Sequence, residues 1–146
     1  MLTTTLQKAL KKNKHTKEVF GGVFPRDCLP IQVSKKKNVA FVVNTDPSDE
    51  IGEHWVVFFF TPQQAFYFDP YGIKPRHKEF LHFLKKRKTY SYWHKRVQGT
   101  GNTCGYFCLY FILSIQGQVN WKIFGDNFTF NDQYVRRLVQ THFQLK

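Results

Sequence analysis

Cysteine and long apolar runs are scarce in this sequence. The three cysteines, Cys28, Cys104 and Cys108, are an odd number and lack the spacing of a disulfide framework, which favours a reducing compartment. The longest apolar run, residues 106–113, is far below the roughly 18 residues that a membrane span needs. The first residues contain no apolar core of a secretory signal. We therefore expect an intracellular protein without a membrane partner.

Acidic side chains are also scarce. The 146 residues include 10 aspartates and glutamates against 22 lysines and arginines, so the formal net charge is +12. An aromatic content of 18% excludes a disordered chain. An aromatic core inside a basic surface favours a nucleic-acid partner, although a basic protein without such a partner is the open alternative. The candidate phosphate contacts are Lys11, Lys12, Lys35, Lys36, Lys37, Lys85, Lys86, Arg87, Lys88, Lys95, Arg96, Arg136 and Arg137.

Length and hydrophobic periodicity predict one domain over residues 1–146, without repeats or a dividing linker. The predicted strands cover residues 39–44, 54–61, 65–69 and 89–93. The predicted helices cover residues 2–13, 78–88, 104–115 and a last segment capped by Asn131 and Asp132. Residues 13–37 are expected to be irregular and residues 45–53 to form an acidic loop. The predicted fold class is α+β, with a small, mostly antiparallel sheet flanked by helices.

The most informative stretch joins a glycine-rich loop to an apolar helix that begins at Cys104. A thiol at a helix N-terminus is shifted toward thiolate, and Gln98, upstream in the loop, offers an amide donor to an oxyanion. His54 opens one predicted strand and Asp69 closes the strand hairpinned to it, so both are expected at one edge of the sheet. The pattern predicts that Asp69 orients His54, and that His54 takes the proton of Cys104.

Each of these residues also has an ordinary interpretation. Histidine at a strand start is commonly a surface residue, aspartate before proline commonly initiates a turn, and cysteine in an apolar helix commonly behaves as a small hydrophobe. The loop does not fit a dinucleotide or phosphate motif, because Cys104 stands where the third glycine belongs and no Gly-Lys-Ser/Thr follows. Cys104 and Cys108 lack two further zinc ligands. We expect no metal, and we expect Cys108 to belong to the core.

Several motifs together carry a family resemblance. In chain order they are Val42-Val-Asn-Thr45, His54-Trp55, Phe68-Asp-Pro-Tyr-Gly72, Val97-Gln-Gly99 and Cys104-Gly-Tyr-Phe-Cys108. This set resembles the adenovirus-type cysteine proteases, or adenains, and in particular the adenain-like proteases of Polinton/Maverick elements and related viruses. They belong to a clan that includes the SUMO and ubiquitin-like proteases, and the resemblance extends from about Phe20 to Gln116.

The resemblance implies a papain-like or adenain-like fold and a cysteine endopeptidase. His54 would be the general base, Asp69 its orienting carboxylate, Cys104 the nucleophile, and Gln98 an oxyanion donor together with the Cys104 backbone N–H. The implied substrates are capsid or core precursor proteins cleaved at Gly-containing sites, in the virion and the host nucleus or cytoplasm. The protein would act as a monomer, without a cofactor for the chemistry and with DNA as an activator.

The chain departs from the adenoviral pattern in two respects. Asp69 stands where the adenoviral enzymes often have glutamate, although the ubiquitin-like proteases of the clan use aspartate. No cysteine lies between Pro75 and Val97, so a disulfide-linked peptide activator is not expected. Two alternatives remain open at this point: an isopeptidase acting on ubiquitin-like Gly-Gly tails, and a basic nucleic-acid-binding module without catalysis.

Overall fold

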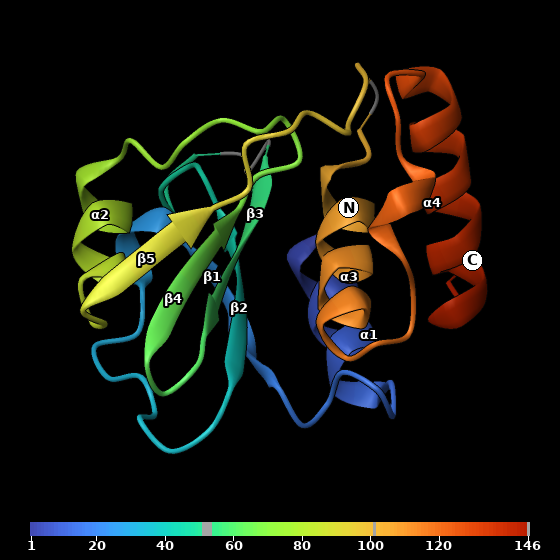
Figure 1. The fold of residues 1–146 in the computed structure, drawn as a ribbon. Helices are drawn as coiled ribbons and strands as arrows, with labels where there is room; N and C mark the ends of the chain where they lie inside the picture. The colour runs from blue at the N-terminus through green and yellow to red at the C-terminus, as the bar shows by residue number, and fades with distance from the viewer. Residues whose placement is uncertain (51–53, 101, 146) are drawn as a thin grey trace.

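The computed structural model describes residues 1–50, 54–100 and 102–145, in which four α-helices flank one five-stranded sheet (Figure 1). The strands are β1 (Phe20–Pro25), β2 (Val39–Asn44), β3 (Trp55–Phe60), β4 (Gln64–Phe68) and β5 (Thr89–Tyr92). The helices are α1 (Thr3–Lys12), α2 (Lys78–Leu84), α3 (Cys104–Ile115) and α4 (Phe128–His142), with short 3-10 turns η1 (Arg26–Cys28) and η2 (Trp121–Ile123). None of the helices in these ranges has the length and apolarity of a membrane span. The α+β class is confirmed.

The sheet is mixed, with two parallel and two antiparallel pairings, and is not mostly antiparallel as expected; its order is β1-β2-β3-β4-β5. Its centre is antiparallel, because β3 pairs with both β2 and β4 in that sense. Its two edges are parallel, since β1 runs alongside β2 and β5 alongside β4 in the same direction. The predicted hairpin of β3 and β4 and the central position of β3 are confirmed. This hairpin sets the relative placement of the two residues that flank it.

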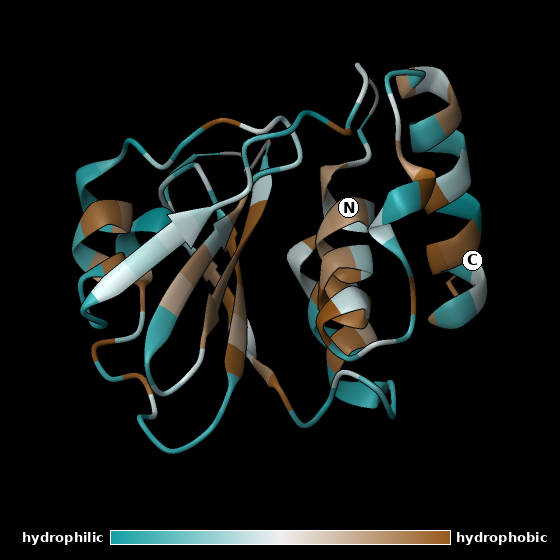
Figure 2. Cartoon of the chain, in the orientation of Figure 1, coloured by the Kyte–Doolittle hydropathy of each residue, from teal (hydrophilic) through white to brown (hydrophobic). Residues whose placement is uncertain are grey.

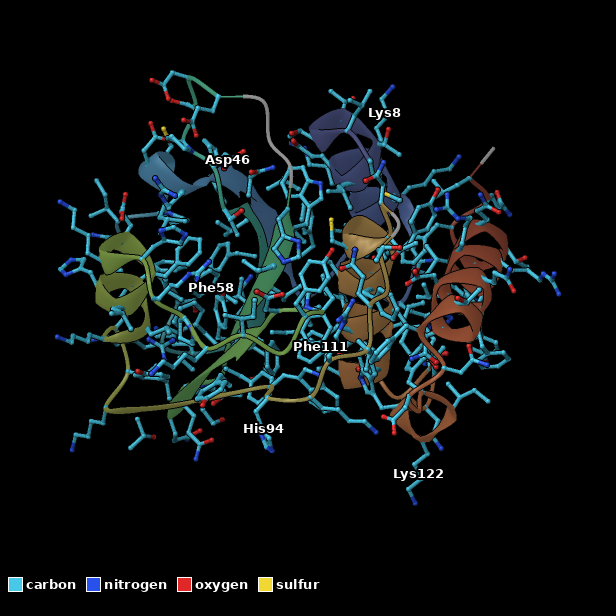
Figure 3. The ribbon with its side chains drawn as sticks, turned by 90° about the horizontal axis from the view of Figure 1, so that it is seen from above. Lys8, Asp46, Phe58, His94, Phe111 and Lys122 are labelled. Carbon is cyan, nitrogen blue, oxygen red and sulfur yellow. The ribbon has the colours of Figure 1, made fainter. Side chains whose placement is uncertain are left out.

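Alternating side chains divide the core into two layers, one on each face of the sheet. Val56, Phe58 and Phe60 of β3 pack toward α2, whereas Trp55 and Val57 pack toward α1, α3 and α4. This period of two is the pattern of a strand that is buried on both faces. Figures 1 and 2 show α2 covering one face, α3 and α1 covering the other, and hydrophobic residues concentrated on the central strands and α3. In Figure 3, Phe58 lies on the α2 side and Phe111 on the α3 side.

Three expectations about secondary structure were wrong. The segment expected to be irregular contains β1. Two of its residues are glycines, which do not predict a strand, but both are needed here: a Cβ on Gly21 would overlap the Phe41 ring, and Gly22 has φ +137°. The second helix ends at Leu84 instead of continuing to residue 88. Asn131 and Asp132 lie inside α4, because Asn127 caps this helix by accepting a hydrogen bond from the backbone N–H of Phe130 at 3.0 Å. Residues 51–53 of the acidic loop lie outside the described residues.

Candidate active site

Cys104 is the first residue of α3, a helix that is apolar almost all round. Nine of its twelve residues are buried, from Cys104 to Leu113, and this burial fixes the helix between the sheet and α4. The first turn of a helix carries unpaired backbone N–H groups and the positive end of the dipole. The Cys104 thiol, only 6% exposed, therefore sits where a thiolate is favoured over a thiol.

His54 and Asp69 meet at one end of the β3–β4 hairpin, as the register predicts. Val57 pairs with Phe68, so His54 and Asp69 lie just beyond the paired strand ends. His54 Nε2 lies 2.8 Å from Asp69 Oδ1, and the backbone N–H of Tyr71 donates to the same oxygen at 2.8 Å. The Tyr71 ring stacks on His54 with a centroid distance of 5.0 Å and an interplanar angle of 25°. The imidazole is thus held from its edge and from its face.

The thiol and the imidazole shift each other's protonation in opposite directions. Burial alone would lower the pKa of His54, but hydrogen bonds and charge from Asp69 and Cys104 raise it to about 9. Burial alone would raise the pKa of Cys104, but the hydrogen bond and charge of His54, with hydrogen bonds to the backbone at Trp55 and Gly105, lower it below its ordinary value. Opposite shifts of this kind describe a thiolate–imidazolium pair. Because Nε2 faces Asp69, Nδ1 is the nitrogen available to Cys104.

The segment that carries Gln98 is fastened to the turn after Asp69. The Pro70 carbonyl accepts the backbone N–H groups of Val97 at 2.9 Å and of Gln98 at 3.1 Å. The two segments approach so closely that a Cβ on Gly72, which has φ +72°, would lie 2.7 Å from the carbonyl carbon of Lys95. Gln98 is 1% exposed. The structure therefore gathers His54, Asp69, Gln98 and Cys104, predicted from three separate stretches, into one region.

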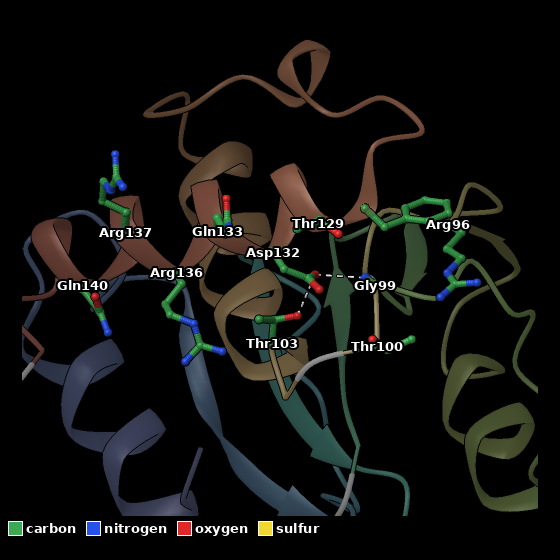
Figure 4. Close-up of a pocket in the computed structure, with 11 residues that line it drawn as sticks. Arg96, Gly99, Thr100, Thr103, Thr129, Asp132, Gln133, Arg136, Arg137 and Gln140 are labelled. Atoms are coloured by element: carbon green, nitrogen blue, oxygen red, sulfur yellow. Dashed lines mark hydrogen bonds between the residues drawn. The ribbon is translucent and has the colours of Figure 1, made fainter.

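Two residues of α4 contact the segment from Val97 to Thr103, and sequence reasoning missed both as parts of the site. Asp132 Oδ1 accepts hydrogen bonds from the Gly99 backbone N–H and from Thr103 Oγ1, each at 2.9 Å (Figure 4). Asn131 Nδ2 donates to the Val97 carbonyl at 3.0 Å and to the Gly125 carbonyl at 2.9 Å. In the sequence, Asn131 and Asp132 are two adjacent polar residues beside the apolar positions of a helix. This pattern fits a helix cap as well as it fits a contact with a distant loop.

A pocket of about 740 Å³ opens between α4 and this loop (Figure 4). Gly99, Thr100 and Thr103 form one wall of the pocket, and residues of α4, including Arg136, form the other. Arg96 also lines the pocket. The lining includes Thr103, the residue before Cys104, whereas His54 and Asp69 line a separate pocket with Tyr71.

The predicted phosphate contacts do not form a single surface. Those around residues 35–37 and 85–88 lie at the α2 end of the molecule, and Arg136 and Arg137 at the α4 end (Figure 1). The structure contradicts the assignment of Arg87, which is 8% exposed. Its guanidinium donates to the backbone carbonyls of Thr61 and Ser34, so it ties loops together instead of facing a ligand.

Comparison with solved structures identifies the fold. ASFV pS273R protease aligns with a TM-score of 0.55 and 15% sequence identity over 95% of this chain, and its selenomethionine form with 0.51 and 19% over 75%. The chain spans 66% and 44% of the chains in these two structures of pS273R. The SUMO protease Ulp1, with its catalytic cysteine oxidized to a sulfinic acid, aligns at 0.45 and 14% over 75% of this chain and 55% of its own, too weakly to establish a shared fold. No protein-family model and no curated protein matches the chain by sequence. The chain therefore has the cysteine-protease fold of pS273R, whereas an adenain identity stays a prediction.

Proposed function

We propose that this chain is a cysteine endopeptidase in which Cys104 is the nucleophile, His54 the general base and Asp69 its orienting carboxylate. The observation that carries the proposal is the alignment of Asp69, His54 and Cys104 at the N-terminus of α3, with the pKa of His54 raised to about 9 and that of Cys104 lowered. A structural cysteine has no need of a paired imidazole, and burial without such a pair raises the pKa of Cys108 well above its ordinary value.

The chemistry follows from this pair. The Cys104 thiolate attacks the carbonyl carbon of the scissile amide, a C–S bond forms, and the carbonyl π electrons move onto oxygen. When the tetrahedral intermediate collapses, the C–N bond breaks and His54 gives its proton to the leaving amine. A water molecule, deprotonated by His54, then attacks the thioester, and the C–S bond breaks to release the carboxylic acid and regenerate the thiolate.

The developing oxyanion needs hydrogen-bond donors that are fixed before the reaction. We assign this task to the side-chain amide of Gln98 and the backbone N–H of Cys104. The burial of Gln98 and the attachment of its backbone N–H to the Pro70 carbonyl support this assignment. Asp69, which precedes Pro70, and Gln98 are thereby held in one unit.

The proposed substrates are viral or mobile-element capsid and core precursors cleaved at Gly-containing sites, as the motif resemblance implies. The residue after the nucleophile is closely packed: a Cβ on Gly105 would lie 3.0 Å from Met1 Cβ and 3.5 Å from Trp55 Cδ1, and Trp55 Nε1 donates to the Met1 carbonyl at 3.0 Å. Cleavage after the Gly-Gly end of a ubiquitin-like protein is the alternative.

The test is a cleavage assay with two substrate arms: an internally quenched Gly-containing peptide and a ubiquitin-like precursor ending in Gly-Gly. The wild type should cleave the peptide, the C104A variant should cleave neither substrate, and the control variant C28A should match the wild type because Cys28 is an exposed thiol without a role in the proposed chemistry. Full turnover by C104A would refute the proposal. Cleavage of the Gly-Gly precursor alone would favour the isopeptidase.

DNA is proposed as an accessory partner of the same enzyme. The net charge of +12 and the exposed lysines and arginines on both ends of the molecule support it. DNA would concentrate the protease on packaged substrates in the virion or nucleus, without taking part in the chemistry.

A further inference from the structure

The loop between Gln98 and Cys104 has no regular structure in its described residues, yet it joins an oxyanion donor to the nucleophile. Two adjacent residues of α4 hold the loop and the residue before it at three points, two on the backbone and one on a side chain. Asn131, which is fully buried, holds the Val97 carbonyl before Gln98. Asp132 holds the Gly99 N–H directly after Gln98 and the Thr103 hydroxyl directly before Cys104.

We propose that Asn131 and Asp132 are positioning residues of the active site, which hold the oxyanion loop in its reactive shape. This inference rests on the proposed protease function. Thr103 occupies the N-cap position of α3 but makes no capping bond with its side chain, because its hydroxyl is directed to Asp132. The carboxylate therefore fixes the loop at both ends with one oxygen, Oδ1, and Gln98 lies between the fixed points.

Loss of Asp132 should act on the reaction rather than on binding. A glycine-containing loop released at Gly99 and Thr103 samples further conformations, and only a fraction of them aims the Gln98 amide at the oxyanion. Hydrogen bonds to a charged acceptor are worth roughly 10-fold to 100-fold in an equilibrium. We expect D132A to lower kcat by about this factor while KM changes little.

The variant series separates positioning from structure. D132N keeps an oxygen that can accept both hydrogen bonds, so it should recover most of the activity, and D126A, which removes an exposed acid from the segment before α4, should match the wild type. Alkylation of Cys104 by iodoacetamide forms no oxyanion, so its rate in D132A should remain that of the wild type in a C28S background. Equal losses in alkylation and turnover, or a D132N variant as poor as D132A, would overturn the proposal.

A readout that does not depend on catalysis is hydrogen exchange at the Gly99 amide. Its protection should fall at least tenfold in D132A and persist in D126A, measured at one pH with unchanged global stability. If the wild type cleaves no substrate, the proposed function fails, and this exchange experiment still decides whether Asp132 holds the loop. Unchanged protection in D132A would refute the clamp alone.

A second inference comes from the charges that line the pocket beside the same loop. The guanidinium of Arg96 is held in place, with Nε donating to the Gln98 carbonyl at 2.8 Å and its plane over the Phe128 ring at 4.5 Å. Arg136 lies over the Tyr106 ring at 4.9 Å. Figure 4 shows the two arginines on opposite sides of the contact between Asp132 and Gly99.

Neither Arg96 nor Arg136 forms an ion pair in the part of the chain that the structure describes. The ion pairs there within 4.0 Å are Arg26–Glu79 and His54–Asp69. Asp132, the carboxylate in the lining, has Oδ1 engaged by Gly99 and Thr103. Two oriented guanidinium groups without an acidic partner, in a concave site, suit a carboxylate.

We infer that this pocket binds an acidic side chain of the polypeptide substrate, close to the scissile bond. The position of the pocket favours a substrate over DNA, because its wall includes Thr103, the residue before Cys104, and because it is hollow rather than a surface that a duplex can lie against. The inference deepens the proposed function by adding a charge preference to it.

Matched peptides test this preference. Internally quenched Gly-containing peptides carry a single Glu, moved through the four positions on each side of the cleavage site, and each has a Gln twin. At one or more positions the wild type should favour Glu by about 5-fold in kcat/KM at low salt. R136Q should abolish the preference, and K122Q, which removes an exposed charge outside the pocket, should keep it.

Equal cleavage of every Glu and Gln pair, or a preference that survives in R136Q, would refute the pocket assignment while leaving the protease intact. If no peptide is cleaved, binding of the same pairs to the C104A variant by fluorescence anisotropy decides the matter. Tighter binding of a Glu peptide that is lost in C104A/R136Q supports the pocket, and equal binding of both twins refutes it.

Discussion

Replacing Asp69 with asparagine should uncouple the thiol from the imidazole. Asp69 supplies the strongest of the interactions that raise the pKa of His54 against the effect of burial. Without that charge, the buried imidazole loses its preference for the protonated form, and the Cys104 thiolate loses the cation that stabilises it. The substitution keeps the size of the side chain, so the packing around His54 and Tyr71 should persist.

The structure gives the size of the effect. The pKa of His54 is raised from 6.5 to about 9, which corresponds to about 3 kcal/mol of added preference for imidazolium at about 1.4 kcal/mol per pKa unit. If D69N removes even a third of this, about 1 kcal/mol, the equilibrium between the thiolate–imidazolium pair and the neutral pair should shift about 5-fold toward the neutral pair. In the wild type, the reactive pair is lost at high pH as His54 deprotonates near 9, and at low pH as Cys104 is protonated below its ordinary pKa.

The measurement is the pH dependence of Cys104 alkylation by iodoacetamide, in a C28S background that removes the exposed thiol. Cys108 is fully buried and its pKa is raised, so iodoacetamide should not alkylate it. We expect the wild-type profile to rise below the ordinary thiol pKa of 9.0 and the D69N profile to move to higher pH. Superimposable profiles with a midpoint near 9 would show that no ion pair exists and would refute the reasoning.

Four further predictions follow from the same structure. Q98A should lower kcat by roughly 10²–10³ with KM nearly unchanged, and an unchanged kcat would remove Gln98 from the oxyanion site. G72A should lower the free energy of unfolding by at least about 1–3 kcal/mol in urea titration, because φ +72° is strained for alanine; a wild-type midpoint would contradict this. R87A should cost about 1–3 kcal/mol in the same assay, whereas K88A, at an exposed neighbouring position, should cost almost nothing. DNA affinity should fall steeply between 50 and about 200 mM salt, and a flat dependence would leave the basic surface without this role.

The residues of the thiol–imidazole–carboxylate group were predictable because the information that places them is local. Two strands joined by a short turn fix the register of His54 and Asp69 to within a residue or two. A polar loop followed by an apolar helix places Cys104 at a helix N-terminus. Neither inference needs any knowledge of how distant parts of the chain pack.

The features that were missed depend on distant contacts or on burial. β1 pairs with β2 across a long connection, and its glycines carry no strand signal. Asp132 contacts a loop that lies about thirty residues earlier in the chain, so its local pattern is that of a cap. Arg87 belongs to a basic run, and charge alone does not reveal that one member of the run is buried.

The proposed base and the proposed nucleophile belong to different layers of the protein. His54 and Asp69 are attached to the sheet, whereas Cys104 is attached to α3, and the apolar interface between the two layers sets their separation. Proton transfer between Cys104 and His54 requires hydrogen-bond distance and alignment. It therefore depends strongly on the spacing between the sheet and α3. A cavity in this interface should abolish the proposed activity at temperatures where circular dichroism still reports a folded protein.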